Sequence, residues 1–384
     1  MQIAMVGAGY TAGEADQLRR DMAAWKKTGR LERHRPRLLS GFAARGISVR
    51  FGEMLYQQIQ GFGEYGFPES HAASFALLVY ASAWLKVHHP AAFTCALLNS
   101  QPMGFYSASS LVRDAQRHGV EARAVCVLYS GWDCLLEPLC APDRSGSSGD
   151  GALRLGMRLV KGFGEAAAYA VIEARRDAPF ADMSDLVRRA GLKKNEVEAL
   201  AESGALAAIL PARREALWRA RAPKVEGLFE GLSIEAEEEI GLPPLQPIEQ
   251  LVLDYGRVGL SLYDHPVRHL RAQLGRKVRR AEELIKLRDG ARITVAGLVV
   301  GRQRPGTASG VTFVSLEDET GVINVVVTLK TFNANYLVAR HAKLMLVQGK
   351  LERKGEVIHV LAQKLERLEL PGAEVVPTTS RDFH

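Results

Sequence analysis

VTFVSLEDETGVINVVV, residues 311–327, alternates apolar and polar side chains on either side of a short turn. Successive side chains of a β-strand point to opposite faces, so the pattern predicts two half-buried strands, 311–317 and 322–327. The four residues between them, 318–321, fit the connection of a hairpin.

Farther out, similar runs predict strands at 293–302, 344–352 and 357–364, and a short helix at 329–336. Three strands, a helix and two more strands is the element order of an OB-fold barrel. We therefore expect such a barrel over residues 291–370.

One aromatic residue of the first hairpin is a candidate contact for nucleic acid. If Val314 points into the barrel, the adjacent Phe313 points outward, where an aromatic ring can stack on a base. Arg302 and Arg304 flank this position, and we predict that all three contact DNA. The alternative is that Phe313 packs under the hairpin turn at 353–356.

A second candidate site is the turn VKGFGE, residues 160–165, which lies between two helical stretches. Glycines allow a sharp turn whose backbone N–H groups reach phosphates without reading sequence. Lys161, Gly162, Phe163 and Gly164 are therefore predicted to bind DNA as a helix-hairpin-helix motif. The alternative is a simple turn between helices.

The N-terminal hundred residues read as helical and hold two further candidates. Arg19 and Arg20 lie side by side in ADQLRRDM, residues 15–22, and could clamp a triphosphate or be two surface arginines. Ser70 and His71 follow a Gly-rich aromatic turn at the start of a helix, where N–H groups attract anions. The alternatives are a plain N-cap for Ser70 and a buried, hydrogen-bonded His71.

Charge and composition narrow the class of protein. The net charge of the 384 residues is +7, and residues 1–50 hold ten Lys or Arg against four Asp or Glu. Such a cluster suits a polyanion or a solvated helix face. The four cysteines form no C-x-x-C pair, which argues against a zinc site. The longest apolar helix candidate, 72–85, is shorter than the ~20 residues that span a bilayer, so we expect a soluble, cytoplasmic protein with no membrane partner.

The stretch FGEYGFPESHAASFALLVYASAWL, residues 62–85, resembles the fingers of bacterial C-family DNA polymerases. The segment at 15–22, with Asp21 where the family usually has Ala, and the stretches 154–175, 181–206 and 308–327 extend the likeness. The chain as a whole is most similar to a C-terminal fragment of the DNA polymerase III alpha-like enzymes, and within them to the error-prone, damage-inducible branch.

This resemblance implies roles for the candidate residues. It places Arg19 and Arg20 near the incoming dNTP, with Ser70 and His71 close by. It implies paired helix-hairpin-helix units on the duplex of primer-template DNA and a barrel that binds the single-stranded template. The complete polymerase would be a nucleotidyltransferase that uses Mg²⁺.

The family holds its metal ions with carboxylates in D-x-D form, and no D-x-D occurs in this chain. Glu317 and Glu319 have the same spacing but flank a turn, and we expect them to be solvated. We therefore predict no catalytic residue, no metal ligand and no cofactor in this chain, so that its own enzymatic activity is uncertain. A truncated gene, a fragment and one piece of a split polymerase are all open.

The expected fold is multidomain α+β, in which mostly helical fingers and a helix-hairpin-helix region precede a C-terminal OB-fold β-barrel. The predicted boundaries are 1–106 for the fingers, 107–222 for the helix-hairpin-helix domain, 223–290 for a linker and connecting helices, 291–370 for the barrel and 371–384 for a disordered tail. Residues 224–229 lack the Gln of a clamp-binding peptide, so the resemblance implies an adaptor protein of the mutasome that links the chain to the sliding clamp.

These observations lead to one expected function and two alternatives. The first is the C-terminal portion of an error-prone DNA polymerase acting in translesion synthesis and damage-induced mutagenesis. The second is a stand-alone, non-catalytic DNA-binding accessory module. The third is an RNA-binding protein, against which the duplex-binding hairpins argue.

Overall fold

The computed structural model describes residues 2–28, 30–65, 69–102, 104, 106–139, 151–222, 241–305, 310–370 and 381–383. The chain divides into two compact units, Met1–Trp84 and Leu85–His384. The segment 224–229, which lacks the Gln of a clamp-binding peptide, lies outside the described residues.

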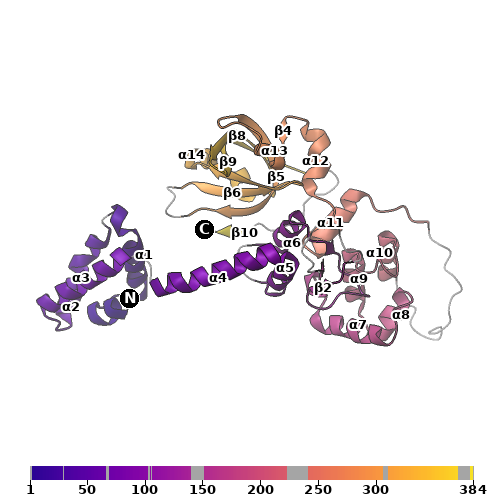
Figure 1. The fold of residues 1–384 in the computed structure, drawn as a ribbon, viewed down its shortest axis with the longest axis horizontal. Helices are drawn as coiled ribbons and strands as arrows, with labels where there is room; N and C mark the ends of the chain where they lie inside the picture. Colours follow the sequence, from indigo (N-terminus) through magenta and orange to yellow (C-terminus); the bar gives the residue numbers. More distant parts are fainter. Residues whose placement is uncertain are drawn as a thin grey trace. The chain divides into compact units, whose positions relative to one another are not determined.

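The first unit is helical (Figure 1). Its elements are η1 Ile3–Gly7, α1 Ala12–Thr28, η2 Arg30–His34, α2 Arg35–Ala44, α3 Val49–Tyr65 and the start of α4 Glu69–His88. Apolar residues recur on one face of α1 and α2, and Leu18, Leu38 and Phe42 are buried there in a common core. Because that core holds α1, the side chains on its opposite face stay accessible.

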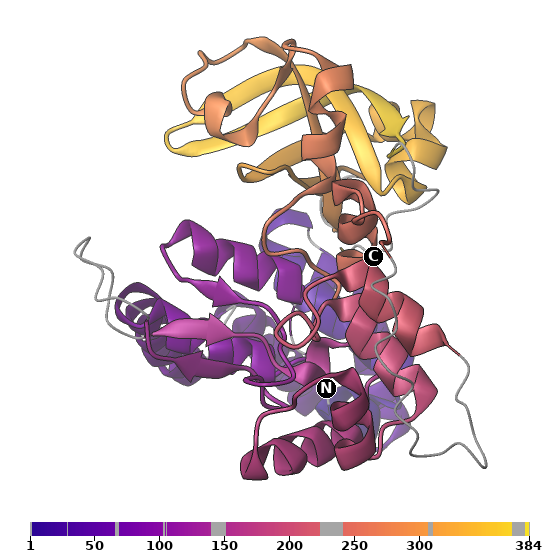
Figure 2. The same cartoon turned by 90° about the vertical axis from the view of Figure 1, so that its right-hand side faces the viewer.

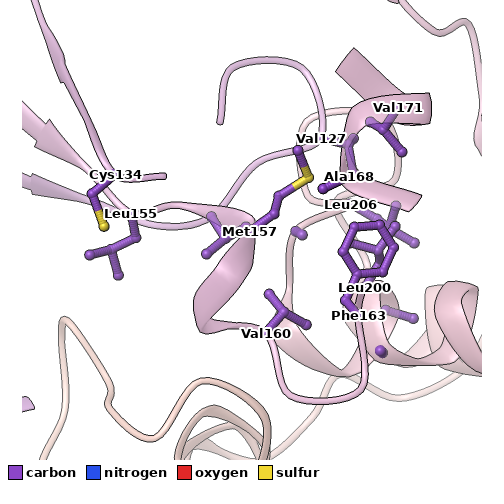
Figure 3. Close-up of a cluster of buried hydrophobic side chains, with 14 of the residues drawn as sticks. Val127, Cys134, Leu155, Met157, Val160, Phe163, Ala168, Val171, Leu200 and Leu206 are labelled. Carbon is purple, nitrogen blue, oxygen red and sulfur yellow. The ribbon is translucent and has the colours of Figure 1, made fainter. Parts of the chain in front are cut away.

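The helical half of the second unit contains a small three-stranded sheet. Its helices are α5 Pro90–Asn99, α6 Ala108–Arg117, η3 Met157–Leu159, α7 Glu165–Asp177, α8 Met183–Ala190, α9 Lys194–Ser203, α10 Arg213–Arg221 and α11 Pro247–Arg257; the strands are β1 Ala122–Arg123, β2 Leu135–Glu137 and β3 Ala152–Arg154. One continuous core includes residues of α5 to α10, β1 and β3, and part of it is drawn in Figure 3. The buried Leu251 and Tyr255 of α11 belong to a separate cluster.

After α12 Pro266–Leu274, β4 Val278–Arg279 and α13 Ala281–Leu284, the chain forms a barrel of five strands (Figure 2). The strands β5 Arg292–Gln303, β6 Thr312–Glu317, β7 Val322–Val327, β9 Val357–Leu368 and β8 Leu344–Lys354 are neighbours in that order, and β8 pairs back onto β5 to close the sheet. Gly349 lies at a register shift where a Cβ would collide with the carbonyl oxygen of Leu361. The prediction of helical regions followed by an OB-fold barrel is confirmed.

Two details of the barrel differ from the expected elements. The single helix predicted at 329–336 is two, α14 Leu329–Ala334 and α15 Tyr336–His341, because Asn335 leaves the helical conformation between them. Three residues of the tail that was predicted to be disordered, Arg381–Phe383, form β10 and pair with β5; residues 371–380 lie outside the described part of the chain.

The acidic residues at the end of β6 are a correction to the expectation that Glu317 and Glu319 are solvated. Glu317 is fully buried, with Oε1 3.0 Å from Nε of Arg113 on α6 and 3.5 Å from Nε2 of His265. Arg271 on α12 pairs with Glu319 at 2.7 Å and with Asp318 at 2.9 Å. The first hairpin of the barrel is thus held to the helical half by ion pairs.

Candidate nucleic-acid interface

The turn Lys161–Gly164 connects η3 to α7 and has the geometry of a helix-hairpin-helix. Gly162 has φ +82°, a left-handed conformation that side chains with a Cβ rarely adopt. Lys161, Gly162 and Gly164 are exposed. Their arrangement leaves a short loop of backbone at the protein surface, as the sequence predicts.

Phe163 was predicted to bind DNA as part of the backbone turn, and its side chain lies in a different environment from those of its neighbours. Its side chain is only 4% exposed and belongs to the core with Val160, Val171 and Leu200 (Figure 3). A ring that is enclosed by apolar side chains cannot stack on a base, so Phe163 anchors the hairpin and does not contact DNA through its side chain.

The backbone amides of the hairpin divide into two kinds. Those of Lys161 and Phe163 donate to the carbonyl oxygens of Arg257 and Val160, at 2.8 and 3.1 Å. Those of Gly162 and Gly164 make no hydrogen bond within the part of the chain that the structure describes. Gly164 also precedes the first turn of α7, where N–H groups have no partner within the helix. These amides are available to a phosphate.

A second hairpin follows in the chain. The helix α8 ends at Gly191, whose φ of +63° gives it a left-handed C-cap, and α9 begins three residues later. Leu192 between them is buried. Two helix-hairpin-helix units in succession match the paired motif that the resemblance implies.

On α1, Arg19 and Arg20 lie together and share one carboxylate that the sequence reading did not single out. Asp16 accepts two hydrogen bonds from each arginine, and its carboxylate is 2.9 Å from Arg19 and 2.6 Å from Arg20. These hydrogen bonds hold the pKa of Asp16 below its ordinary value. The i−3 and i−4 spacing of Asp16 from the pair was the signal that would have identified it.

Ser70 and His71 lie at the start of α4. Their side chains lie outside the described residues, so their predicted role stays a prediction.

The outer surface of the barrel carries two of the three residues predicted there, Phe313 and Arg304. Phe313 is 42% exposed, whereas Val314 and Leu316 point into the core, in the alternation that the sequence predicts. Gln303 of β5 and Val326 of β7 pair with Phe313 on either side. A partly exposed ring between two strands is a platform on which a base can stack.

The two arginines that flank this ring have unlike environments. Arg304 is exposed, with its guanidinium 5.0 Å from the centre of the Phe332 ring. Arg302 is buried and donates hydrogen bonds to the carbonyl oxygens of Ala339 and Ala342 at the end of α15. The prediction that Arg302 contacts DNA is therefore corrected, because its guanidinium stabilises the C-terminus of a helix instead.

The resemblance implies Mg²⁺ for the complete polymerase, and the described residues form no site that fits it. Within the described ranges, no three His, Cys, Asp or Glu side chains lie together as a metal site requires. The buried acids of β6 pair with arginines and do not fit Mg²⁺. Separately, none of the helices described is long and apolar enough to cross a membrane.

Three family descriptions match parts of this chain. A helix-hairpin-helix motif matches residues 119–216, an OB-fold nucleic acid binding domain matches 293–368, and a bacterial DNA polymerase III alpha subunit finger domain matches 1–46. The fold and the candidate site thus define a nucleic-acid-binding protein.

Curated relatives are similar to this chain over its full length. Error-prone DNA polymerases of Pseudomonas syringae pv. tomato and Azoarcus sp. are each 50% identical over 100% of this chain and are covered to 37% and 36% of their own length. The chain belongs to the bacterial C-family DNA polymerases and matches their error-prone branch. It spans little more than a third of the length of these relatives.

Among solved structures, ygiW of E. coli aligns with 24% of this chain and 89% of its own, at 19% identity and a TM-score of 0.20. That likeness is too low to add to the assignment.

Proposed function

We propose that this chain is the DNA-handling portion of an error-prone polymerase that acts in translesion synthesis and damage-induced mutagenesis. The observation that carries the proposal is the combination, on one chain, of a hairpin with accessible glycine amides and a barrel with an exposed Phe313. The first suits the phosphates of duplex DNA, and the second suits the bases of a single strand.

In this proposal the helical first unit binds the incoming dNTP. Arg19 and Arg20 are exposed and their partner Asp16 lies on the same helix. A triphosphate, with more charge and more acceptor oxygens than one carboxylate, competes for the two guanidinium groups. Asp16 then acts as a placeholder that keeps the pair oriented when no nucleotide is bound.

The chemistry of nucleotide addition is assigned to a part of the polymerase outside this sequence. No D-x-D occurs here, and the complete enzyme would supply the Mg²⁺ ligands. We also propose that an adaptor protein links the chain to the sliding clamp. The protein acts in the cytoplasm.

The test is a titration of labelled primer-template DNA at about 50 and about 200 mM NaCl, with primer extension measured in parallel. We expect binding that weakens steeply with salt, because phosphate contacts release counterions. We expect no extension by this chain alone. Robust metal-dependent extension, or binding that is insensitive to salt, would overturn the proposal.

Replacing Phe313 with alanine distinguishes the contribution of the barrel to DNA binding from that of the hairpins. We expect the affinity for single-stranded DNA to fall by about 5- to 150-fold, corresponding to ~1–3 kcal/mol for one lost stacking contact. The affinity for blunt duplex should change less than two-fold. Fluorescence anisotropy with both ligands measures the difference.

Leu337→Ala is the matched control, because Leu337 is an exposed apolar residue on α15. It should leave both affinities unchanged. Equal losses in the two variants would show that Phe313 has no specific role.

A further inference from the structure

Glu202 on α9 is the centre of a cationic network that no sequence motif indicates. Its carboxylate accepts hydrogen bonds from Nε of Arg257 on α11 and from Arg221 on α10, the latter at 2.8 Å. Its backbone carbonyl accepts a hydrogen bond from Arg213. Three arginines from two other helices therefore converge on one residue.

The network is continuous with the first hairpin. The amide of Lys161 donates to the carbonyl oxygen of Arg257 at 2.8 Å, and the guanidinium of Arg257 donates back to the carbonyl oxygen of Lys161 at 3.3 Å. Nζ of Lys194 donates to the carbonyl oxygen of Arg221 at 3.1 Å. The accessible amides of Gly162 and Gly164 thus adjoin this group of cations.

Positive charge exceeds negative charge in this network. It contains four cationic side chains, Lys194, Arg213, Arg221 and Arg257, and two carboxylates, Glu202 and Asp254. Lys161 joins it only through its backbone. Burial raises the pKa of Glu202, but the hydrogen bonds and charges of Arg257 and Arg221 lower it by more. This carboxylate is therefore ionised at neutral pH. A net positive surface beside exposed amides attracts an anion.

The guanidinium of Arg221 retains capacity for a ligand. Its side chain is 61% exposed and uses one nitrogen on Glu202. A guanidinium offers five N–H donors, and carboxylate and phosphate oxygens match the same fork. Glu202 therefore fixes the inner edge of Arg221 while its outer edge faces solvent.

We propose that Arg221 and Arg257, oriented by Glu202, form a phosphate-binding site of their own next to the hairpin, and that its ligand is the backbone of duplex DNA. Both arginines lie beyond residue 216, where the match to the helix-hairpin-helix description ends. Glu202 is the positioning residue of this site. The inference rests on the proposed function, since it extends the duplex-binding surface.

The experiment compares R221Q and E202Q with the wild-type chain by anisotropy on a labelled duplex and a labelled single strand over a range of salt. For R221Q we expect about 8-fold weaker duplex binding near 0.1 M salt and a salt slope reduced by about 0.9, the contribution of one phosphate contact. For E202Q we expect weaker duplex binding although a negative charge has been removed. If only the net charge mattered, removing this carboxylate would strengthen duplex binding.

R176Q is the matched control, because Arg176 on α7 is as exposed as Arg221 and also pairs with one carboxylate, that of Glu173. Its slope should stay at the wild-type value. Since Arg221 is on the surface, R221Q remains decisive even if circular dichroism shows that E202Q is unfolded.

Three results would overturn the inference alone, with wild-type duplex binding intact. They are an R221Q slope equal to that of R176Q, tighter binding by folded E202Q, and a larger loss on the single strand than on the duplex. A wild-type chain that binds neither ligand would instead refute the proposed function itself.

Discussion

Replacing Glu317 with glutamine is expected to destabilise the second unit by about 3–5 kcal/mol, because one partner of a buried ion pair is removed and the other stays buried. Arg113 would lose its carboxylate, whose Oε1 lies 3.0 Å from Nε of the guanidinium. Urea unfolding followed by circular dichroism measures the change. Glu366→Gln, at a partly exposed pair with Lys364 on β9, should cost less than about 0.5 kcal/mol.

The same cluster gives this destabilisation a pH dependence. Burial opposes ionisation of Glu317, but His265 and Arg113 outweigh it and keep its pKa below the ordinary value. Burial also lowers the pKa of His265, whose Nδ1 accepts a hydrogen bond from the amide of Val267 at 3.1 Å and so carries no proton. Both groups bind fewer protons in the folded state than in the unfolded state.

The unfolding free energy should therefore fall on acidification. The part due to His265 is complete above its ordinary pKa and is lost as the pH falls from there. The part due to Glu317 is lost only below the ordinary range of a glutamate, and E317Q should lack it. This account would be contradicted if E317Q were as stable as wild type at neutral pH. It would also be contradicted if the unfolding free energy of E317Q fell on acidification as steeply as that of wild type.

Truncating Phe163 to alanine is expected to cost about 3–5 kcal/mol, which is the usual loss for a buried phenylalanine. The ring lies in the core that also holds Val160, Val171 and Leu200. Phe163→Leu, which keeps most of the volume, should cost less than about 1.5 kcal/mol. Thermal and urea unfolding give both values.

Tyr169→Ala supplies the control on the same stretch of chain, because Tyr169 on α7 is an exposed aromatic residue. Its effect should stay within about 0.5 kcal/mol. If F163A kept its stability and lost affinity for duplex DNA instead, the ring would contact DNA and would not anchor the hairpin.

Much of the fold was predictable because its signals are local. The alternation in 311–327 gives both strands of the first hairpin, and β7 has the predicted bounds. It also puts Phe313 and Val314 on opposite faces, and the structure shows Phe313 outside and Val314 inside the barrel. Period, turn residues and element order are properties of neighbouring residues, so a single sequence carries them.

Site residues were harder to predict where a charged side chain had no local partner. Arg302 and Arg304 look alike in the sequence, yet one guanidinium is buried against the end of α15 and the other is exposed. Asp16 was within reach of prediction, because its partners lie on the same turn of helix. Glu317 was not, because Arg113 and His265 come from distant parts of the chain.

The sequence by itself determined the family, the order of helices and strands, and the face on which each strand buries its apolar side chains. Only the tertiary structure decided which cations are used internally and which remain for a ligand. The reason is physical: a charge is satisfied by whichever partner packing brings within a few ångströms, and residues 161, 202, 221 and 257 meet only when four separate segments have folded together.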